Sequence, residues 1–324
     1  MAQQAVRKKS EPKQPVEPVN IIVEEAEPSI GIIAVDNGGF NTKILTQDMD
    51  KPVIMSSKKG FGSSYDPFGT AKYPDGTYRV SWNNKTYFFG LLLNSTRRHL
   101  SSFTPTKSTD YFVLSILMGT ALYGYDINYL ITTTPYSRYS EEEMSLIIGR
   151  LIGDHEININ GSIYKFKIEE CYVAPEAIIA SYAIKPWGKH RWVDLGSRTV
   201  GFGTTFGDQD TGFFYPIWDE CDTIEKEGLD IRSVLDKEQD ELKEYVKEYI
   251  ENIYNELSPF FDDNDPMTIF GGGALVPEIA EEMKVRFPNM DVAEDPLTIQ
   301  VRGLMEYALT SDVYGSDEEY VEEE

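Results

Sequence analysis

Runs of apolar residues alternate along the chain with stretches in which apolar positions recur at helical spacing. Residues 30–36 (IGIIAVD) form a continuous apolar run that ends at a turn, which predicts a strand buried on both faces. Residues 127–135 (INYLITTTP) predict a second strand of this kind, and the runs at 41–46 and 52–57 extend the first strand as a meander. The alternation of such strands with helical stretches indicates an α/β protein.

Helices are predicted at 108–126 and at 140–153, the second of which opens with the capping-box sequence SEEE. The dipeptides at 83–84 (Asn-Asn) and 160–161 (Asn-Gly) lie between alternating runs and predict hairpins. A shorter helix is predicted over 175–185 (PEAIIASYAIK), because a proline is tolerated in the first turn, where its missing N–H costs nothing.

The second half of the chain repeats the opening pattern. Val193-Asp194-x-Gly196 has the same form as Val35-Asp36-x-Gly38, and each follows an apolar run and precedes a β-rich stretch. Two long charged helices are then predicted at about 222–257, followed by a short strand (MTIF), a helix from about Pro277 and a last helix in PLTIQVRGLMEYAL. Two halves that each open with a strand, an aspartate and a glycine turn suggest a duplicated α/β unit facing a shared cleft.

The bulk composition narrows the class of protein. The formal net charge is −24 and the pI is near 4.5, which argues against binding of DNA or RNA through a broad basic face. Cys171 and Cys221 are the two cysteines, without a CxxC pair, and buried free thiols in a reducing cytoplasm are predicted. No apolar run approaches the roughly 20 residues of a spanning helix, so we expect a soluble, cytoplasmic protein.

Both ends of the chain are predicted to be disordered. Residues 1–29 are rich in Lys, Gln, Glu and Pro, and residues 313–324 end in an acidic run. Neither segment carries enough apolar surface to offset the entropy of ordering.

The two aspartate-glycine turns predict a site for a phosphate and a divalent cation. Each aspartate lies where a buried strand ends, which is where open α/β sheets place ligands. The glycines allow backbone N–H groups to approach a phosphate. A carboxylate beside a phosphate is repulsive unless a cation lies between them, so Asp36 and Asp194 suit a hydrated Mg²⁺, while Lys43 supplies a point charge to the phosphates. Each Asp-x-Gly taken alone is equally typical of an ordinary turn.

A third glycine cluster strengthens this interpretation. Residues 271–273 are three consecutive glycines in IFGGGALVP, between a short strand and a helix. Glycines cost about 0.5–1 kcal/mol each relative to alanine inside regular structure, so a run of them implies close passage of the backbone past a flat group such as a nucleotide base and ribose. Neither a Walker A sequence nor a GxGxxG after the first strand is present.

The sequences AVDNGGFNTK, VDLGSRTVGFGT and IFGGGALVP resemble the two phosphate motifs and the adenosine motif of the actin-like ATPases. PEAIIASYA and PLTIQVRGLMEYA resemble the two helices that connect the lobes of that fold. The chain is most similar to the ParM-type bacterial actins carried by plasmids or phages. The resemblance implies an actin-like fold of two RNase H-like lobes around a nucleotide cleft. Lobe I is expected at 30–190, with a small inserted subdomain at about 47–104 and a returning helix at about 297–312. Lobe II is expected at 191–296.

The resemblance also implies roles for individual residues. Asp36 and Asp194 would hold Mg²⁺ through water and, with Glu176, form the catalytic set, in which Glu176 orients or activates the attacking water. Independently of the resemblance, a glutamate in the first turn of a helix is also favoured by the helix dipole alone. The residues expected to bind the nucleotide are Asn37, Gly38, Gly39, Asn41, Lys43, Gly196, Ser197, Arg198, Thr199, Gly271, Gly272, Gly273 and Ala274.

The expected function is a Mg²⁺-dependent ATPase that forms filaments and moves or segregates plasmid DNA, with GTP left open as the nucleotide. The expected partners are further copies of the chain and a DNA-binding adaptor protein, without direct contact to nucleic acid or membrane. A sugar- or acetate-kinase-like phosphotransferase that does not polymerise is the alternative, because the same superfamily fold serves both activities.

Overall fold

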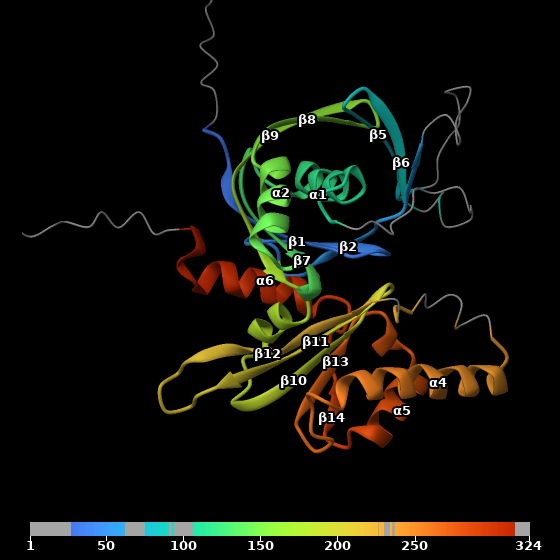
Figure 1. Cartoon of the computed structure of the whole chain (residues 1–324). Helices are drawn as coiled ribbons and strands as arrows, with labels where there is room; N and C mark the ends of the chain where they lie inside the picture. Colours follow the sequence, from blue (N-terminus) through green and yellow to red (C-terminus); the bar gives the residue numbers. More distant parts are fainter. Residues whose placement is uncertain are drawn as a thin grey trace, which may run out of the picture.

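Two β-sheets lie one above the other, with helices between them and on their outer faces (Figure 1). The computed structural model describes residues 27–61, 75–90, 93, 106–225, 227–229, 234 and 237–314. The chain enters the first sheet at Ser29, whose backbone N–H and hydroxyl both donate to the carboxylate of Asp126 at 2.8 Å. Most of the two predicted disordered tails, residues 1–26 and 315–324, lies outside the described residues.

The first sheet has nine strands in the order β3-β2-β1-β7-β9-β8-β5-β6-β4. Its centre is parallel, since β7 pairs in parallel with both β1 and β9, and its flanks are antiparallel hairpins. The strands predicted at 52–57 and in the hairpin around 83–84 are present and continue this sheet, and the two hairpin asparagines have the positive φ that such a turn requires. The strands are β1 (Ile30–Asn37), β2 (Asn41–Thr46), β3 (Val53–Ser56), β4 (Lys59–Phe61), β5 (Thr77–Trp82), β6 (Lys85–Gly90), β7 (Ile127–Thr134), β8 (Gly153–Ile159) and β9 (Ser162–Pro175).

The second sheet has five strands in the order β12-β11-β10-β13-β14. Strand β10 pairs antiparallel with the strand that follows it and parallel with β13, just as β1 pairs antiparallel with β2 and parallel with β7. The repeated Asp-x-Gly pattern therefore corresponds to a repeated arrangement of strands. The strands are β10 (Gly188–Leu195), β11 (Thr199–Gly207), β12 (Phe214–Glu225), β13 (Met267–Phe270) and β14 (Met290–Val292).

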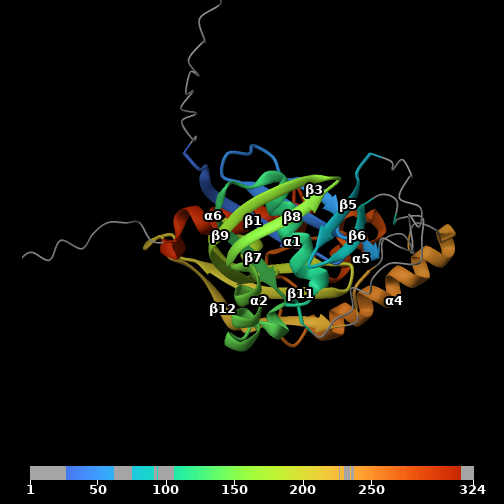
Figure 2. The same cartoon turned by 90° about the horizontal axis from the view of Figure 1, so that it is seen from above.

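Helices form three layers around the two sheets. α1 and α2 pack on the outer face of the first sheet, α6 and η4 lie between the sheets, and α4 and α5 cover the outer face of the second sheet (Figure 1). Figure 2 shows the second sheet beneath the first, with α4 extending along its edge. The helices are α1 (Asp110–Tyr123), η3 (Tyr136–Arg138), α2 (Glu141–Leu151), η4 (Ile178–Ala183), α4 (Gln239–Leu257), η5 (Gly273–Leu275), α5 (Pro277–Arg286), α6 (Ile299–Thr310) and η6 (Asp312–Tyr314).

This arrangement is the α/β actin-like fold that the sequence predicts. The expected residue limits of the two lobes and of the inserted subdomain stay predictions. Strands β3 to β6 fall within that expected subdomain, and they hydrogen-bond into the first sheet.

The short helix predicted over 175–185 is wrong at its start. β9 continues to Pro175, which lies opposite Thr134 of β7, and Glu176 follows in a turn. Ala177 has φ +63°, a value that no right-handed helix contains, and the six residues after it form a 3₁₀ helix. Strand pairing therefore overrides the proline rule, and Glu176 projects from the end of a strand rather than from a helix.

The long charged helices predicted from about 222 are also wrong at their start. Residues 222–225 belong to β12, which pairs with β11 as far as Glu225, and the helix α4 begins at Gln239. Asp222 and Glu225 in this part of β12 are exposed, and their spacing of three residues imitates a helical polar face.

The two cysteines are free thiols, and two of the histidines form hydrogen bonds within the fold. Both thiols are free, and burial raises the pKa of Cys171 to about 12 and that of Cys221 to about 11, so both remain protonated at neutral pH. The rings of His155 and His190 hydrogen-bond to Leu151 and Thr268, respectively. Across the described ranges, no helix combines the length and the apolar composition needed to cross a bilayer.

Candidate functional site

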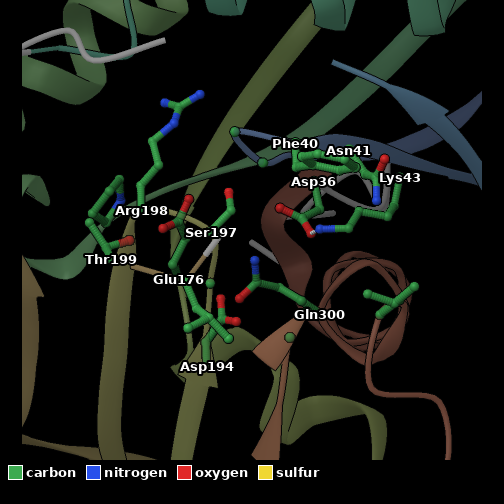
Figure 3. A pocket seen from close by; sticks show the side chains of 18 of the residues that line it. Asp36, Phe40, Asn41, Lys43, Glu176, Asp194, Ser197, Arg198, Thr199 and Gln300 are labelled. Carbon is green, nitrogen blue, oxygen red and sulfur yellow. Dashed lines mark hydrogen bonds and ion pairs between the residues drawn. The ribbon is translucent and has the colours of Figure 1, made fainter. Parts of the chain in front are cut away.

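A cavity of about 500 Å³ lies between the two sheets, which is within the range of small-ligand sites. Its walls come from the turns after β1 and β10, from the start of the segment between β13 and α5, and from α6. Figure 3 shows Asp36 and Lys43 on one side of the cavity and Asp194 and Glu176 on the other, with Gln300 between them. The carboxyl ends of β1 and β10 therefore meet at one place, as the repeated motif predicts.

Asp36 and Lys43 face each other across the β1–β2 hairpin. They are paired in register, so their side chains lie on the same face, and Lys43 Nζ is 2.8 Å from Asp36 Oδ2. Burial alone would raise the pKa of Asp36, but the ammonium of Lys43 outweighs it and holds that pKa below its usual range. The pKa of Lys43 is raised for the same reason, because Asp36 outweighs its burial. Both groups are therefore charged at neutral pH.

The pKa of Asp194 is shifted in the opposite direction to that of Asp36. Burial raises the pKa of Asp194 to about 8; Lys43 opposes this rise, and the nearby carboxylates of Glu176 and Asp36 add to it. No described residue donates a hydrogen bond to its carboxylate. An acidic group with this pKa ionises readily only when a cation comes close to it.

Gly271 allows the third glycine motif to pass beside Asp194. Its φ is +85°, and a Cβ at this position would lie 2.2 Å from Asp194 Oδ1. The neighbouring Gly272 would meet nothing within 4 Å, because it borders the cavity itself. The backbone of this turn thus passes directly against Asp194 at Gly271, and Gly272 leaves open space in the cavity.

Glu176 forms an ion pair with Lys107, a residue that the sequence analysis did not single out. Lys107 Nζ contacts Glu176 Oε1 and also donates to the carbonyl oxygen of Asn37 at 3.3 Å. Both side chains line the cavity, and they are only 9% and 13% exposed, respectively. The carboxylate expected to act on water is therefore neutralised by a neighbouring ammonium in this structure.

The two phosphate-type turns also contact each other directly. A Cβ on Gly39 would lie 2.3 Å from the Arg198 side chain, so the turn after β1 lies against a residue of the turn after β10. The Arg198 guanidinium lies over the rings of Tyr111 and Phe112, 5.7 and 5.3 Å from their centroids. Arg198 thus spans the cavity and packs against α1 on the other side.

Gln300 of α6 joins three parts of the site. Its side-chain oxygen accepts a hydrogen bond from the backbone N–H of Ala177 at 2.9 Å, and its side chain lies close enough to Asp36 to help lower the pKa of that carboxylate. Gln300 is 5% exposed, in a helix whose other buried residues are mostly apolar. A buried glutamine in an apolar stripe is a feature that sequence analysis could have used to find it.

The cavity brings together most of the residues predicted from the sequence. These are Asp36, Gly38, Gly39, Asn41, Lys43, Glu176, Asp194, Gly196, Ser197, Arg198, Thr199, Gly271 and Gly272. The predicted residues Asn37, Gly273 and Ala274 do not line it; Asn37, for example, is buried and donates to the carbonyl of Phe112 at 2.9 Å. Lining residues absent from the prediction are Phe40, Lys107, Phe112, Pro135, Arg138, Glu225, Leu229, Leu275, Leu297 and Gln300.

The donor groups suit a magnesium ion held through water. Two carboxylates, Asp36 and Asp194, enter the cavity from opposite sheets, and Mg²⁺ prefers oxygen ligands and keeps several waters. The open space at Gly272, within the cavity of about 500 Å³, would admit a hydrated ion with a polyphosphate. Among the described residues, no three His, Cys, Asp or Glu side chains converge closely enough to hold an ion directly.

Comparison with known proteins identifies the fold. Residues 34–178 match the family model described as the N-terminal domain of actin-like proteins. The structure is similar to a non-polymerisable quadruple mutant of pCBH ParM (TM-score 0.71, 15% identity), covering 87% of this chain and 100% of that one. It is also similar to an AlfA filament bound to AMPPNP (TM-score 0.62, 18% identity), covering 87% of this chain and 98% of that one.

A third similar structure is an archaeal actin homologue in complex with ADP (TM-score 0.67, 14% identity), covering 87% of this chain and 100% of that one. No curated protein matches the chain by sequence. The resemblance to actin-like proteins of the ParM type, expected from the three glycine motifs, is confirmed.

Proposed function

We propose that this chain, which has the actin-like fold, is a Mg²⁺-dependent ATPase that assembles into filaments when it binds nucleotide. The observation that carries the proposal is the meeting of two aspartate-glycine turns from separate sheets at one cavity. Asp36 and Lys43 supply one wall of that cavity, Asp194 the other, and Gly272 of the third glycine turn borders open space in the cavity. This is the arrangement that a nucleoside triphosphate with its cation requires.

Each residue then has a chemical task. Asp36 and Asp194 hold the hydration shell of the ion, which, when bound, neutralises charge on the phosphates. Lys43 and the backbone N–H groups of Gly39 and of residues 196–199 contact phosphate oxygens, and Gly271 and Gly272, which line the cavity, follow the adenosine. Glu176 aligns a water whose oxygen attacks the γ-phosphorus; the bond to the β–γ bridging oxygen breaks, ADP leaves, and the proton that Glu176 accepts passes to inorganic phosphate.

Assembly and cargo extend the proposal beyond the cavity. The AlfA relative is a filament that binds AMPPNP, and the ParM relative is a mutant described as non-polymerisable. By this likeness, copies of the chain form a filament that moves or segregates plasmid DNA in the cytoplasm, through a DNA-binding adaptor. The net charge of −24 supports an adaptor rather than direct contact with nucleic acid. Because the purine is recognised mostly by backbone contacts and by the shape of the cavity, GTP is an equally suitable substrate.

The test combines nucleotide binding with assembly. We expect the full chain to bind Mg-ATP by isothermal titration calorimetry, and to sediment as filaments visible by electron microscopy after Mg-ATP is added. Asp36→Ala and Asp194→Ala should each weaken Mg-ATP binding about tenfold or more, because each loses a carboxylate that holds the ion. Unchanged binding in both variants would contradict the proposed site. Binding without sedimentation, together with phosphate transfer to a small-molecule acceptor, would favour a non-polymerising phosphotransferase.

A further inference from the structure

The ion pair between Lys107 and Glu176 neutralises the carboxylate to which the proposed function assigns alignment of the attacking water. Both side chains are largely buried, and both come from the part of the chain that carries the first sheet. Asp36 already has a partner in Lys43, so the site contains two separate ammonium–carboxylate pairs. The Lys107 ammonium in such a pair is held by one carboxylate, so an anion that enters the cavity competes with that carboxylate for it.

The backbone of Lys107 is fixed while its side chain keeps a flexible stem. Its N–H donates to Glu143 Oε1 at 2.7 Å, the hydroxyl of Thr106 donates to the same carboxylate, and the carbonyl of Ser108 accepts from Arg150. Glu143 thereby ties this segment to the first turn of α2. The Lys107 ammonium is therefore confined to one part of the cavity, where rotation of its side chain can move it between neighbouring acceptors.

The Lys107 ammonium lies where a phosphate group bound in the cavity would contact it. Lys107 Nζ also donates to the carbonyl of Asn37, the residue that precedes the first glycine turn. It is close enough to act electrostatically on both Asp36 and Asp194, the two residues assigned to the ion. An oxyanion between those carboxylates would therefore lie beside Lys107 and would compete with Glu176 for it.

We propose that Lys107 is a positioning residue that holds Glu176 in a neutralised pair until a terminal phosphate binds. This inference rests on the proposed function. A γ-phosphate draws the Lys107 ammonium to itself, and Glu176 then loses its partner and becomes available to align water. ADP lacks that phosphate, so it leaves the pair in place. The pair thus couples the presence of the third phosphate to the activation of the carboxylate.

The test compares binding of Mg-AMPPNP and Mg-ADP to the full chain by calorimetry. Lys107→Gln should weaken Mg-AMPPNP binding about tenfold or more while changing Mg-ADP binding less than about threefold, because only the former reaches the ammonium. Glu176→Gln should act in the opposite direction and tighten Mg-AMPPNP binding, because Lys107 no longer has to leave a carboxylate. The control is Lys165→Gln, which breaks an exposed pair with Glu156 (3.2 Å) and should change neither affinity.

Two results would overturn the inference. Equal weakening of both nucleotides by Lys107→Gln, or weaker Mg-AMPPNP binding by Glu176→Gln, would make the pair a static structural contact. Thermal melting checks that each variant is folded, and if Lys107→Gln is unstable, Lys107→Met keeps the apolar stem and answers the same question. Wild-type protein that binds neither nucleotide would instead refute the proposed function itself, and this inference with it.

Discussion

The side-chain oxygen of Gln300 accepts a hydrogen bond from the backbone N–H of Ala177 at 2.9 Å. This bond joins α6 to the turn that carries Glu176, and Ala177 holds that turn in a conformation with φ +63°. A non-glycine residue with positive φ costs about 1 kcal/mol or more, so surrounding contacts must hold it there. Gln300 also lies close enough to Asp36 to help lower the pKa of that carboxylate, so its side chain lies between the water-aligning and the ion-binding parts of the site.

Replacing Gln300 should therefore affect catalysis more than binding. Gln300→Ala leaves the buried N–H of Ala177 without its acceptor, which should lower the free energy of unfolding by about 1–3 kcal/mol. Phosphate release should fall about tenfold or more, while the affinity for Mg-ADP changes little, because Glu176 is misplaced and the phosphate turns are intact. Glu306→Ala, at an exposed position of the same helix, is the control and should change neither quantity. Full phosphate release from Gln300→Ala would remove this residue from the positioning of Glu176.

Trp218 of β12 in the second sheet contacts the segment that follows β7 of the first sheet, and its fluorescence can therefore monitor this contact. Its ring is nearly parallel to those of Tyr136 and Tyr139, at centroid distances of 6.0 and 6.4 Å, and Arg138 binds Glu225 at 3.1 Å beside it. An exposed ion pair contributes at most about 1 kcal/mol, so Arg138→Ala should leave the melting temperature nearly unchanged. We expect it to increase quenching of Trp218 fluorescence by acrylamide, measured as the difference from a Trp218→Phe background. Arg79→Ala, on the exposed side of β5, should leave the quenching as it is.

His190 should make the stability of the second sheet depend on pH. Burial lowers the pKa of His190 from 6.5 to about 4, although Asp291 acts in the opposite direction. The unfolded chain therefore binds a proton at a higher pH than the folded chain does. The stabilisation is complete above pH 6.5 and is lost as the pH falls from 6.5 towards 4.

Denaturant unfolding between pH 7 and pH 4 measures this effect. Wild type should lose about 1–3 kcal/mol more than His190→Gln over that interval, because the carboxyl groups that also titrate there are common to both proteins. Parallel pH profiles for the two proteins would show that the ring is not desolvated in solution.

The parts of the site that could be predicted from the sequence are those encoded by adjacent residues. Asp36 with Gly38, and Asp194 with Gly196, follow apolar strands directly, and local patterns of this kind survive in any tertiary setting. Lys107 carries no such pattern, and Gln300 is marked only as a polar residue within the apolar stripe of α6. Each reaches the cavity only because α1 and α6 pack against β1, and that is a consequence of long-range packing.

The two incorrect element starts have a related cause. Pro175 satisfies the rule for a helix start, but pairing of β9 with β7 continues to that residue and is the stronger constraint. Residues 222–225 satisfy a helical polar pattern, yet β11 offers a partner strand whose hydrogen bonds a local pattern cannot represent. Local propensity fails where tertiary pairing determines the backbone.

The neighbouring glycines Gly271 and Gly272 give a matched pair of substitutions with different expected results. Gly271 has φ +85°, and a Cβ there would lie 2.2 Å from Asp194 Oδ1 and 2.9 Å from the carbonyl of Leu195. Gly271→Ala should lower the free energy of unfolding by about 1–3 kcal/mol, because both the backbone and the contact are strained. Gly272 has φ −64° and nothing within 4 Å of an added Cβ, so Gly272→Ala should leave stability unchanged or raise it by up to about 1 kcal/mol.

Nucleotide affinity separates the role of this turn in binding from its role in folding. The Cβ of Gly272→Ala would occupy the cavity, so the variant should bind Mg-ATP several-fold more weakly in calorimetry although it melts at or above the wild-type temperature. That combination would mean that the glycine is required by a ligand and not by the fold. Wild-type affinity in Gly272→Ala would place the bound nucleotide away from this turn, and the assignment of Gly271 and Gly272 to the adenosine would then be wrong.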